Sequence, residues 1–296
     1  MKQIFLLVLV CCSCVACAQD YRGEFRKLMT HDQEDAIPAL LAEWERNRPD
    51  DAEMFIAHFN YYYNQSRNEF LRISREPVQR EHLAFTDSTG QTAGYLMGDV
   101  AYNDSLFSLA RQYITKGIAK HPNRLDMHFG LLYALREAGY LKDHADELVR
   151  VIGYHAVEKR PWKWSDETDI PDVDAVFTGS VQDYVAALFQ LGAGPYTEGI
   201  RAISTRMIEA YPNAIENYSN LGVCSLLEKD YAEAIKWFQK AKAINEKDAV
   251  VLGNIAYTYS LTGDTRQAIR YYKEMAKYGD KDTAAEAKER IKELEE

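Results

Sequence analysis

One 34-residue pattern occurs twice in succession between Ile215 and Asp282. Apolar and small residues recur at the same offsets in both copies, as in the pairs Leu221 and Ile255, Ala234 and Ala268, and Phe238 and Tyr272. Small residues on both sides of a large ring indicate two helices that approach closely. A two-helix unit of this kind cannot bury its apolar face alone, so it has to stack on its neighbours. The period therefore predicts an all-α array of antiparallel helix pairs, an α-solenoid, and such arrays usually form binding surfaces.

Weaker copies of the pattern extend the array toward the N-terminus. We expect three clear units at residues 181–214, 215–248 and 249–282, and degenerate helical repeats over residues 19–157. Residues 283–296 have apolar side chains on one helical face and charges on the other, which predicts a C-terminal capping helix. Asp282 or Thr283 is the expected N-cap of that helix.

Two segments interrupt the period. Within residues 66–102, turn residues separate short β-prone runs, which predicts a small inserted β-hairpin. Residues 158–180 contain two prolines, two tryptophans and six acidic residues, and we interpret them as an irregular connection between two lobes. A long connection inside a compact array is often functional.

Residues 1–18 have the pattern of a secretory signal peptide. A lysine precedes an apolar run, and Ala16-Cys17-Ala18 forms a cleavage site of the A-x-A type. We therefore expect an exported protein, in the periplasm. An alternative is cleavage before Cys17 followed by lipidation, which would give an outer-membrane lipoprotein. Four of the five cysteines lie in this leader, so cleavage after Ala18 leaves only Cys224, and no internal disulfide can form.

Charge and motif content argue against several function classes. The formal net charge is −10 without a basic run, which argues against nucleic acid and anionic membranes as partners. No segment after the leader is apolar for long enough to span a bilayer. The sequence has no recognisable catalytic or metal-binding motif, so we expect no catalytic residues, no metal and no cofactor.

The repeated residues resemble the tetratricopeptide repeat (TPR) family. The 215 unit matches its pattern at Tyr218, Leu221, Gly222, Ala234, Phe238 and Ala241, and the 249 unit at Leu252, Ile255, Ala256, Tyr259, Ala268 and Tyr272. The whole chain resembles uncharacterised exported TPR proteins of Bacteroidota. The resemblance implies a right-handed superhelix in which the first helix of each pair lines a concave groove, where ligand peptides commonly lie.

The resemblance also implies a set of groove residues, which are identified by their position, or offset, within the repeat. These are Asn60, Tyr63, Phe129, Tyr133, Arg136, Phe189, Asn220, Asn254 and Tyr257. The best-known groove of the family binds a peptide carboxylate through a lysine at offset 5. Here Ser219 and Gly253 occupy that offset, so a groove lined by aromatic and amide side chains is expected instead, suited to an extended peptide or a glycan.

Trp162 and Trp164 are the other candidate binding residues. In an extended segment their rings lie on the same side. Exposed, they would form a platform for a partner or a sugar ring, whereas buried, they would fill the seam between the lobes. The sequence therefore predicts a non-catalytic protein-interaction module of the cell envelope. Two alternatives stay open: a glycan-binding accessory protein, and an enzyme with its site at the lobe junction.

Overall fold

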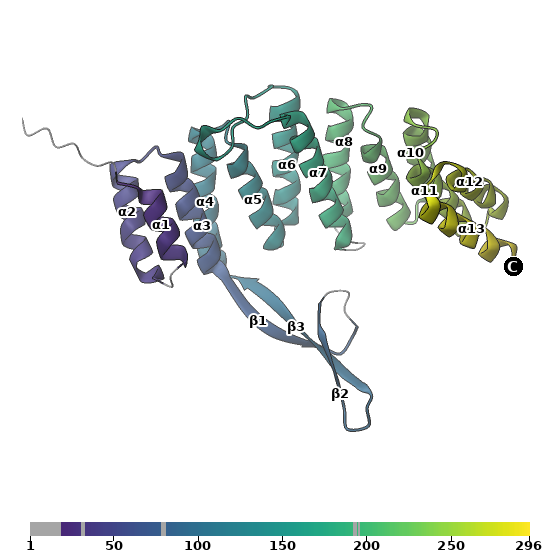
Figure 1. Cartoon of the computed structure of the whole chain (residues 1–296), viewed down its shortest axis with the longest axis horizontal. Coiled ribbons are helices and arrows are strands. Elements are labelled where there is room, and N and C mark those ends of the chain that lie inside the picture. The colour runs from purple at the N-terminus through teal and green to yellow at the C-terminus, as the bar shows by residue number, and fades with distance from the viewer. Residues whose placement is uncertain (1–18, 31–32, 78–80, 192–193, 195) are drawn as a thin grey trace, which may run out of the picture. The chain divides into compact units, whose positions relative to one another are not determined.

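The computed structural model describes residues 19–30, 33–77, 81–191, 194 and 196–296 (Figure 1). The leader expected over residues 1–18 lies outside these residues. The chain forms two compact units, with the boundary between Lys120 and His121. We call them unit 1 and unit 2. Among the described residues, no helix is both long enough and apolar enough to cross a membrane.

Unit 1 consists of two pairs of helices with a sheet inserted in the second pair. Its elements are α1 (Tyr21–Thr30), α2 (Ile37–Asn47), α3 (Ala52–Ser66), β1 (Arg67–Ser74), β2 (Leu83–Thr86), β3 (Thr92–Tyr102) and α4 (Asp104–Lys120). Its core is an apolar cluster in which Trp44 is fully buried and stacks on Tyr21 at 5.6 Å between ring centroids.

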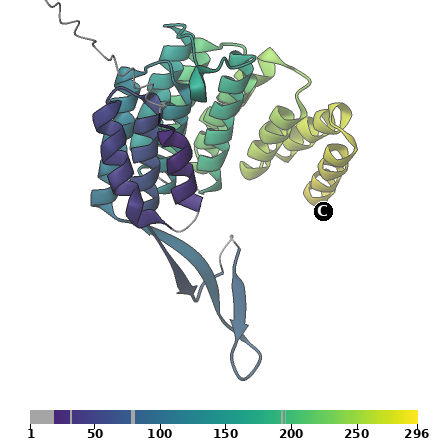
Figure 2. The ribbon, with the colours of Figure 1, turned by 60° about the vertical axis from the view of Figure 1, so that its left-hand side comes forward.

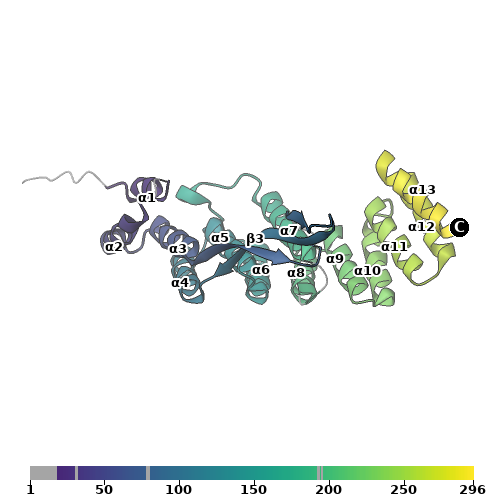
Figure 3. The ribbon, with the colours of Figure 1, turned by 90° about the horizontal axis from the view of Figure 1, so that it is seen from below.

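Unit 2 consists of antiparallel helix pairs followed by one last helix. Its helices are α5 (Leu125–Glu137), α6 (Leu141–Ala156), α7 (Val173–Gln190), α8 (Tyr196–Ala210), α9 (Ile215–Leu227), α10 (Tyr231–Ile244), α11 (Ala249–Leu261), α12 (Thr265–Tyr278) and α13 (Lys281–Glu295). Figure 3 shows these helices following one another in chain order. Consecutive helices pack on one another, except that α6 packs on α8 rather than on α7. The all-α array of stacked helix pairs is thereby confirmed.

The 34-residue period sets the helix boundaries of the last two pairs. The helices α9 and α11 begin at Ile215 and Ala249, which are 34 residues apart, and α10 and α12 begin at Tyr231 and Thr265 with the same separation. An aspartate caps three of these helices, because its side chain accepts a hydrogen bond from a backbone N–H in the first turn. The capping residues are Asp230, Asp248 and Asp264.

The large rings of the pattern lie between the two helices of each pair. Phe238 is fully buried and Tyr272 is 4% exposed, and both belong to one apolar cluster formed by α10, α11, α12 and the capping helix α13. A second cluster joins α5, α6, α7 and α8. Burial of such side chains stabilises the fold by about 1.5–3 kcal/mol each.

The inserted β structure is a three-stranded antiparallel sheet with strand order β1-β3-β2. Strands β2 and β3 form the expected hairpin, and β1 adds a third strand to it. The sheet continues from the end of α3 and extends away from the helices of unit 1 (Figure 2). Its two ends meet at the helices, since the Asn103 N–H donates to the Ser66 carbonyl at 2.8 Å.

One face of this sheet carries a row of exposed aliphatic side chains. Ile73, Leu96 and Leu83 are cross-strand partners and therefore lie on the same face. Leu71, Ile73 and Leu83 are 71%, 64% and 71% exposed, which is uncommon for aliphatic side chains in a folded sheet.

Three boundaries differ from the expected ones. Helix α7 begins at Val173 instead of near residue 181, because the Asp172 side chain accepts a hydrogen bond from the Ala175 N–H. Asp280 caps the last helix, not Asp282 or Thr283. The segment expected to connect two lobes lies inside unit 2, since Lys163 hydrogen-bonds to Asn123 and Leu125 at the start of α5.

Candidate functional site

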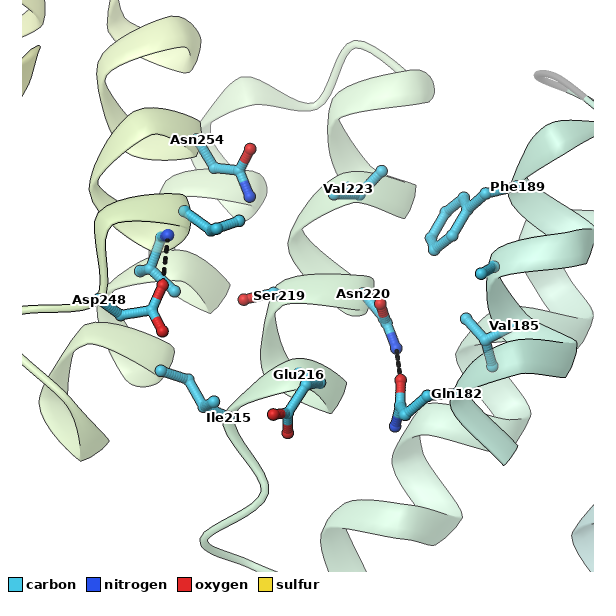
Figure 4. Close-up of a pocket in the computed structure, with 13 residues that line it drawn as sticks. Gln182, Val185, Phe189, Ile215, Glu216, Ser219, Asn220, Val223, Asp248 and Asn254 are labelled. Atoms are coloured by element: carbon cyan, nitrogen blue, oxygen red, sulfur yellow. Dashed lines mark hydrogen bonds between the residues drawn. The ribbon is translucent and has the colours of Figure 1, made fainter. Parts of the chain in front are cut away.

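Unit 2 contains a groove of about 500 Å³ between α7, α9 and α11, the first helices of three successive pairs. Figure 4 shows side chains from all three helices lining it. The apolar lining comes from Val185, Ala186, Phe189, Ile215, Val223, Val250 and Val251, and the polar lining from Gln182, Glu216, Ser219, Asn220, Asp248 and Asn254.

The period explains why these positions line the groove. Gln182, Glu216 and Val250 are successive residues at 34-residue spacing, and Asn220 and Asn254 are another such pair. Residues on the opposite faces of the same helices, such as Leu221 and Ile255, are buried against the second helices. Each first helix therefore presents one face to its partner helix and the other to the groove.

An amide network fixes the groove wall between α7 and α9. The Asn220 amide donates to Gln182 Oε1 at 3.1 Å, and the Gln182 amide donates to Asn217 Oδ1 at 2.9 Å. Asn217 is fully buried, so the network is attached to the interior of the unit. Because these side chains are already ordered, a ligand does not have to order them on binding.

Other polar groups of the groove retain free hydrogen-bonding capacity. The structure gives the side chains of Asn254, Ser219 and Glu216 no hydrogen bond or ion pair to any described residue. Asn254 and Ser219 are half-buried, and Glu216 is exposed. A side-chain amide can both donate to and accept from a peptide backbone. Asn254 is therefore suited to hold an extended chain.

The groove is acidic. Glu216 and Asp248 are its charged residues, and its described lining includes no lysine, arginine or histidine. Asp248 Oδ1 accepts from the Val251 N–H at 2.9 Å, which leaves its second oxygen available. Both carboxylates lie at one end of the groove in Figure 4, and Phe189 and Val223 lie toward the other.

Three of the residues expected in the groove lie on its walls, namely Phe189, Asn220 and Asn254. Tyr257 on α11 and Tyr133 on α5 are 46% and 49% exposed and do not line this cavity. Arg136 stacks over the ring of Tyr133 at 5.6 Å and donates to Glu137 at 2.8 Å.

Phe129 and the two expected residues of unit 1 are placed differently. Phe129 is half-buried among Trp164, Phe177 and Tyr184. Asn60 is exposed on α3. Tyr63 is 8% exposed, because it stacks on Tyr102 of the inserted sheet and on Phe59. Its burial removes it from the residues that can contact a partner.

The two tryptophans do not form a common platform. Trp162 is 5% exposed, belongs to the apolar cluster of α5 to α8, and donates from Nε1 to His155 Nδ1 at 3.0 Å. Trp164 is 40% exposed and makes a T-shaped ring contact with Phe129. Burial of Trp162 rules out a sugar platform made of both rings.

His155 links this segment to α6 and α7. Its Nε2 lies 2.9 Å from Asp174 Oδ1, and its ring stacks on Phe177 at 4.1 Å. Burial lowers the pKa of His155, and Asp174 only partly offsets that effect. Since Nδ1 accepts the Trp162 N–H, the neutral ring with its proton on Nε2 fits this site.

Two other features offer less to a ligand. A hollow of about 370 Å³ between α6 and α8 has its only described cation paired, with Lys142 Nζ 2.6 Å from Asp146 Oδ2. Cys224 is fully buried, which raises the pKa of its thiol to about 12, so the thiolate is not available for chemistry. Among the described residues, no group of three or more His, Cys, Asp or Glu side chains could hold a metal ion.

The groove is also lined by Gln182, Glu216, Val250 and Asp248, which are not among the residues expected there from the sequence. The first three occupy one offset of the repeat and could have been found from the period alone. Asp248 precedes α11 and lies outside the helix, so no helical offset points to it.

The comparisons with known proteins agree with the repeat type. Residues 213–276, which span α9 to α12, match the sequence model of the tetratricopeptide repeat. This part of the chain is therefore similar to TPR repeats, which generally bind proteins or peptides and are typically non-catalytic. No protein of curated function matches the chain.

Several solved structures are similar to the chain at low identity. YrrB, described as a TPR protein with an unusual peptide-binding site, is 13% identical with a TM-score of 0.40, over 84% of this chain and 97% of that chain. The C-terminal part of a TPR repeat-containing protein from Cytophaga hutchinsonii is 14% identical with a TM-score of 0.41, over 92% and 86%. MamA is 15% identical with a TM-score of 0.39, over 59% and 83%. Matches this weak carry no information about the partner of this chain.

Proposed function

We propose that unit 2 is a non-catalytic binding module whose groove holds an extended segment of a partner protein. The observation that supports this function is the groove itself, because the same offsets of three consecutive first helices line it. Binding would combine apolar contacts at Phe189 and Val223 with hydrogen bonds from Asn254 and Asn220 to the peptide backbone.

The dimensions of the groove fit a short extended peptide. Neighbouring helices pack about 8–10 Å apart, so a groove that crosses three of them is about 20 Å long. An extended chain rises about 3.3 Å per residue, and about six residues fill that length. For so short a peptide we expect weak binding, with a Kd of about 1 μM or weaker.

Peptide selection followed by calorimetry tests this function. A random dodecapeptide library is selected on the chain from Gln19 to Glu296, and Kd is measured for the best peptides. We expect Phe189→Ala and Asn254→Ala each to weaken binding about tenfold, because each removes a contact in the groove. Val157→Ala serves as the control, since Val157 is 69% exposed and lies outside the groove. Equal Kd values for all four proteins would refute binding in the groove.

We also propose that the protein is exported, with the leader over residues 1–18 as support. Mass spectrometry of the protein from its native host distinguishes the two processing routes. A mature N-terminus at Gln19 indicates a soluble periplasmic form, and a lipidated Cys17 indicates an outer-membrane lipoprotein. An intact N-terminus at Met1 would refute export.

A further inference from the structure

The described residues at the acidic end of the groove include no cation. Glu216 is exposed and its carboxylate has no hydrogen bond or ion pair to any described residue. Asp248 uses one oxygen as a helix cap and has the other free. Two negative charges therefore face the groove, and the described lining contains no positive side chain to compensate them.

Three basic residues near these helices have contacts elsewhere. Arg201 pairs with Glu228 at 2.6 Å, and Lys242 lies 3.7 Å from Glu274. Lys247, the neighbour of Asp248 in the sequence, lies over the ring of Tyr278 at 5.9 Å. None of these three cations lines the groove, so none of them neutralises the negative charge of Glu216 and Asp248.

The helix dipoles reduce this negative charge without cancelling it. Glu216 lies in the first turn of α9 and Asp248 caps α11, and both positions suit an acid in any soluble helix. The dipole at a helix N-terminus is equivalent to about half a positive charge. Each carboxylate carries a full negative charge, so a net negative potential remains at this end of the groove.

We propose that the groove selects extended peptides that carry a lysine or an arginine. The cation of that residue lies between Glu216 and Asp248, and an apolar side chain elsewhere in the peptide contacts Phe189 and Val223. Figure 4 shows these two sets of residues toward opposite ends of the groove. This inference rests on the proposed function, to which it adds the chemistry of the partner. Opposite charges at a binding surface contribute mainly to specificity and association rate.

The test uses three forms of the chain from Gln19 to Glu296. The double variant Glu216→Gln with Asp248→Asn removes both charges but keeps the side-chain shapes, and asparagine caps a helix about as well as aspartate. The control is Glu289→Gln with Glu295→Gln, which changes the net charge equally on the capping helix α13, outside the groove. Each protein is used to select heptapeptides from one random library, and the best wild-type peptide is then titrated into all three.

We expect wild-type and control proteins to enrich peptides with lysine or arginine, and the double variant to lose this enrichment. The best wild-type peptide should bind the double variant about tenfold more weakly at low salt, and the control less than twofold more weakly. If the selected peptides need Phe189 for binding but are not enriched in lysine or arginine, this inference is overturned and the proposed function stands. If no selected peptide needs Phe189 for binding, both the inference and the proposed function are overturned.

Discussion

Phe238 lies directly against the backbone of Gly222, so a methyl group added to Gly222 would lie 2.4 Å from the ring carbon Cε1 of Phe238. Gly222 is in α9 and Phe238 is in α10, and the ring is fully buried. This contact lets the two helices of the 215 unit approach closely, and it explains why the repeat combines a small residue with a large ring.

Gly222→Ala should destabilise the protein by about 1–3 kcal/mol, because a buried ring cannot move away from the new methyl group. In an unobstructed helix the same change is stabilising by about 1 kcal/mol. Gly179 in α7 provides the control, since a methyl group there would contact nothing within 4 Å. Urea unfolding should therefore show opposite signs for Gly222→Ala and Gly179→Ala, and equal signs would contradict the close approach.

Lys229 occupies the turn position that glycine occupies one repeat later. Its φ is 63°, and Gly263, 34 residues on, has a φ of 78°. Side chains disfavour this left-handed region, so Lys229→Gly should stabilise the fold by about 0.5–1 kcal/mol. Gly263→Ala should destabilise it by a similar amount. A loss of stability in Lys229→Gly, measured by urea unfolding, would be inconsistent with the described turn.

Stability should fall as the pH falls below the ordinary histidine range. Burial lowers the pKa of His155, His144 and His58, so the folded state binds fewer protons than the unfolded state. The stability that these neutral histidines contribute is fully present above the unfolded-state pKa of about 6.5 and is lost as the pH decreases. The loss between pH 7.5 and 5.5 is at most about 1.4 kcal/mol per histidine.

Comparison of wild type with His155→Gln measures how much His155 contributes to this loss of stability at low pH. Protonated His155 would place an N–H against the Trp162 N–H, so acid should also loosen the segment around Trp162. We expect a smaller drop in unfolding free energy for the variant between the two pH values. Identical drops would show that His155 does not titrate on unfolding.

Removal of the inserted sheet should leave the helices of unit 1 folded. Arg67 and Tyr102 are ladder partners, so residues 68–101 can be replaced by an Asn-Gly turn. The cut keeps Tyr102, whose hydroxyl lies 3.3 Å from the Tyr63 hydroxyl. We expect an unchanged helical circular-dichroism signal per helical residue and a melting temperature within a few degrees. Loss of a cooperative melt would show that the sheet is needed for the helix pair α3–α4.

The period predicted units that begin at residues 215 and 249, where α9 and α11 begin, because each repeated contact is local to one helix pair or its neighbour. It did not predict β1, whose sequence is charged and only weakly β-prone. That strand exists because it pairs with β3 over its whole length. The expectation that Tyr63 lines the groove failed for a similar reason. The sheet that covers Tyr63 is an insertion, and the repeat pattern does not include it.

The candidate site was predicted in part. Offsets led to Phe189, Asn220 and Asn254, but not to its acidic end, which depends on Asp248 outside a helix and on a described lining without a cation. Burial of Trp162 depends on the fold of a whole connection around His155. Contacts of that kind follow from tertiary packing, which a repeat pattern does not encode.

The most direct measurement of the central claim is the NMR spectrum of asparagine side-chain amides during a titration with a selected peptide. The protein is labelled with nitrogen-15 at asparagine only. We predict that the signals of Asn254 and Asn220 shift with the peptide concentration, while that of Asn103, which caps α4 in unit 1, stays constant. A peptide that binds by calorimetry without moving the signals of Asn254 and Asn220 would contradict the groove as the binding site.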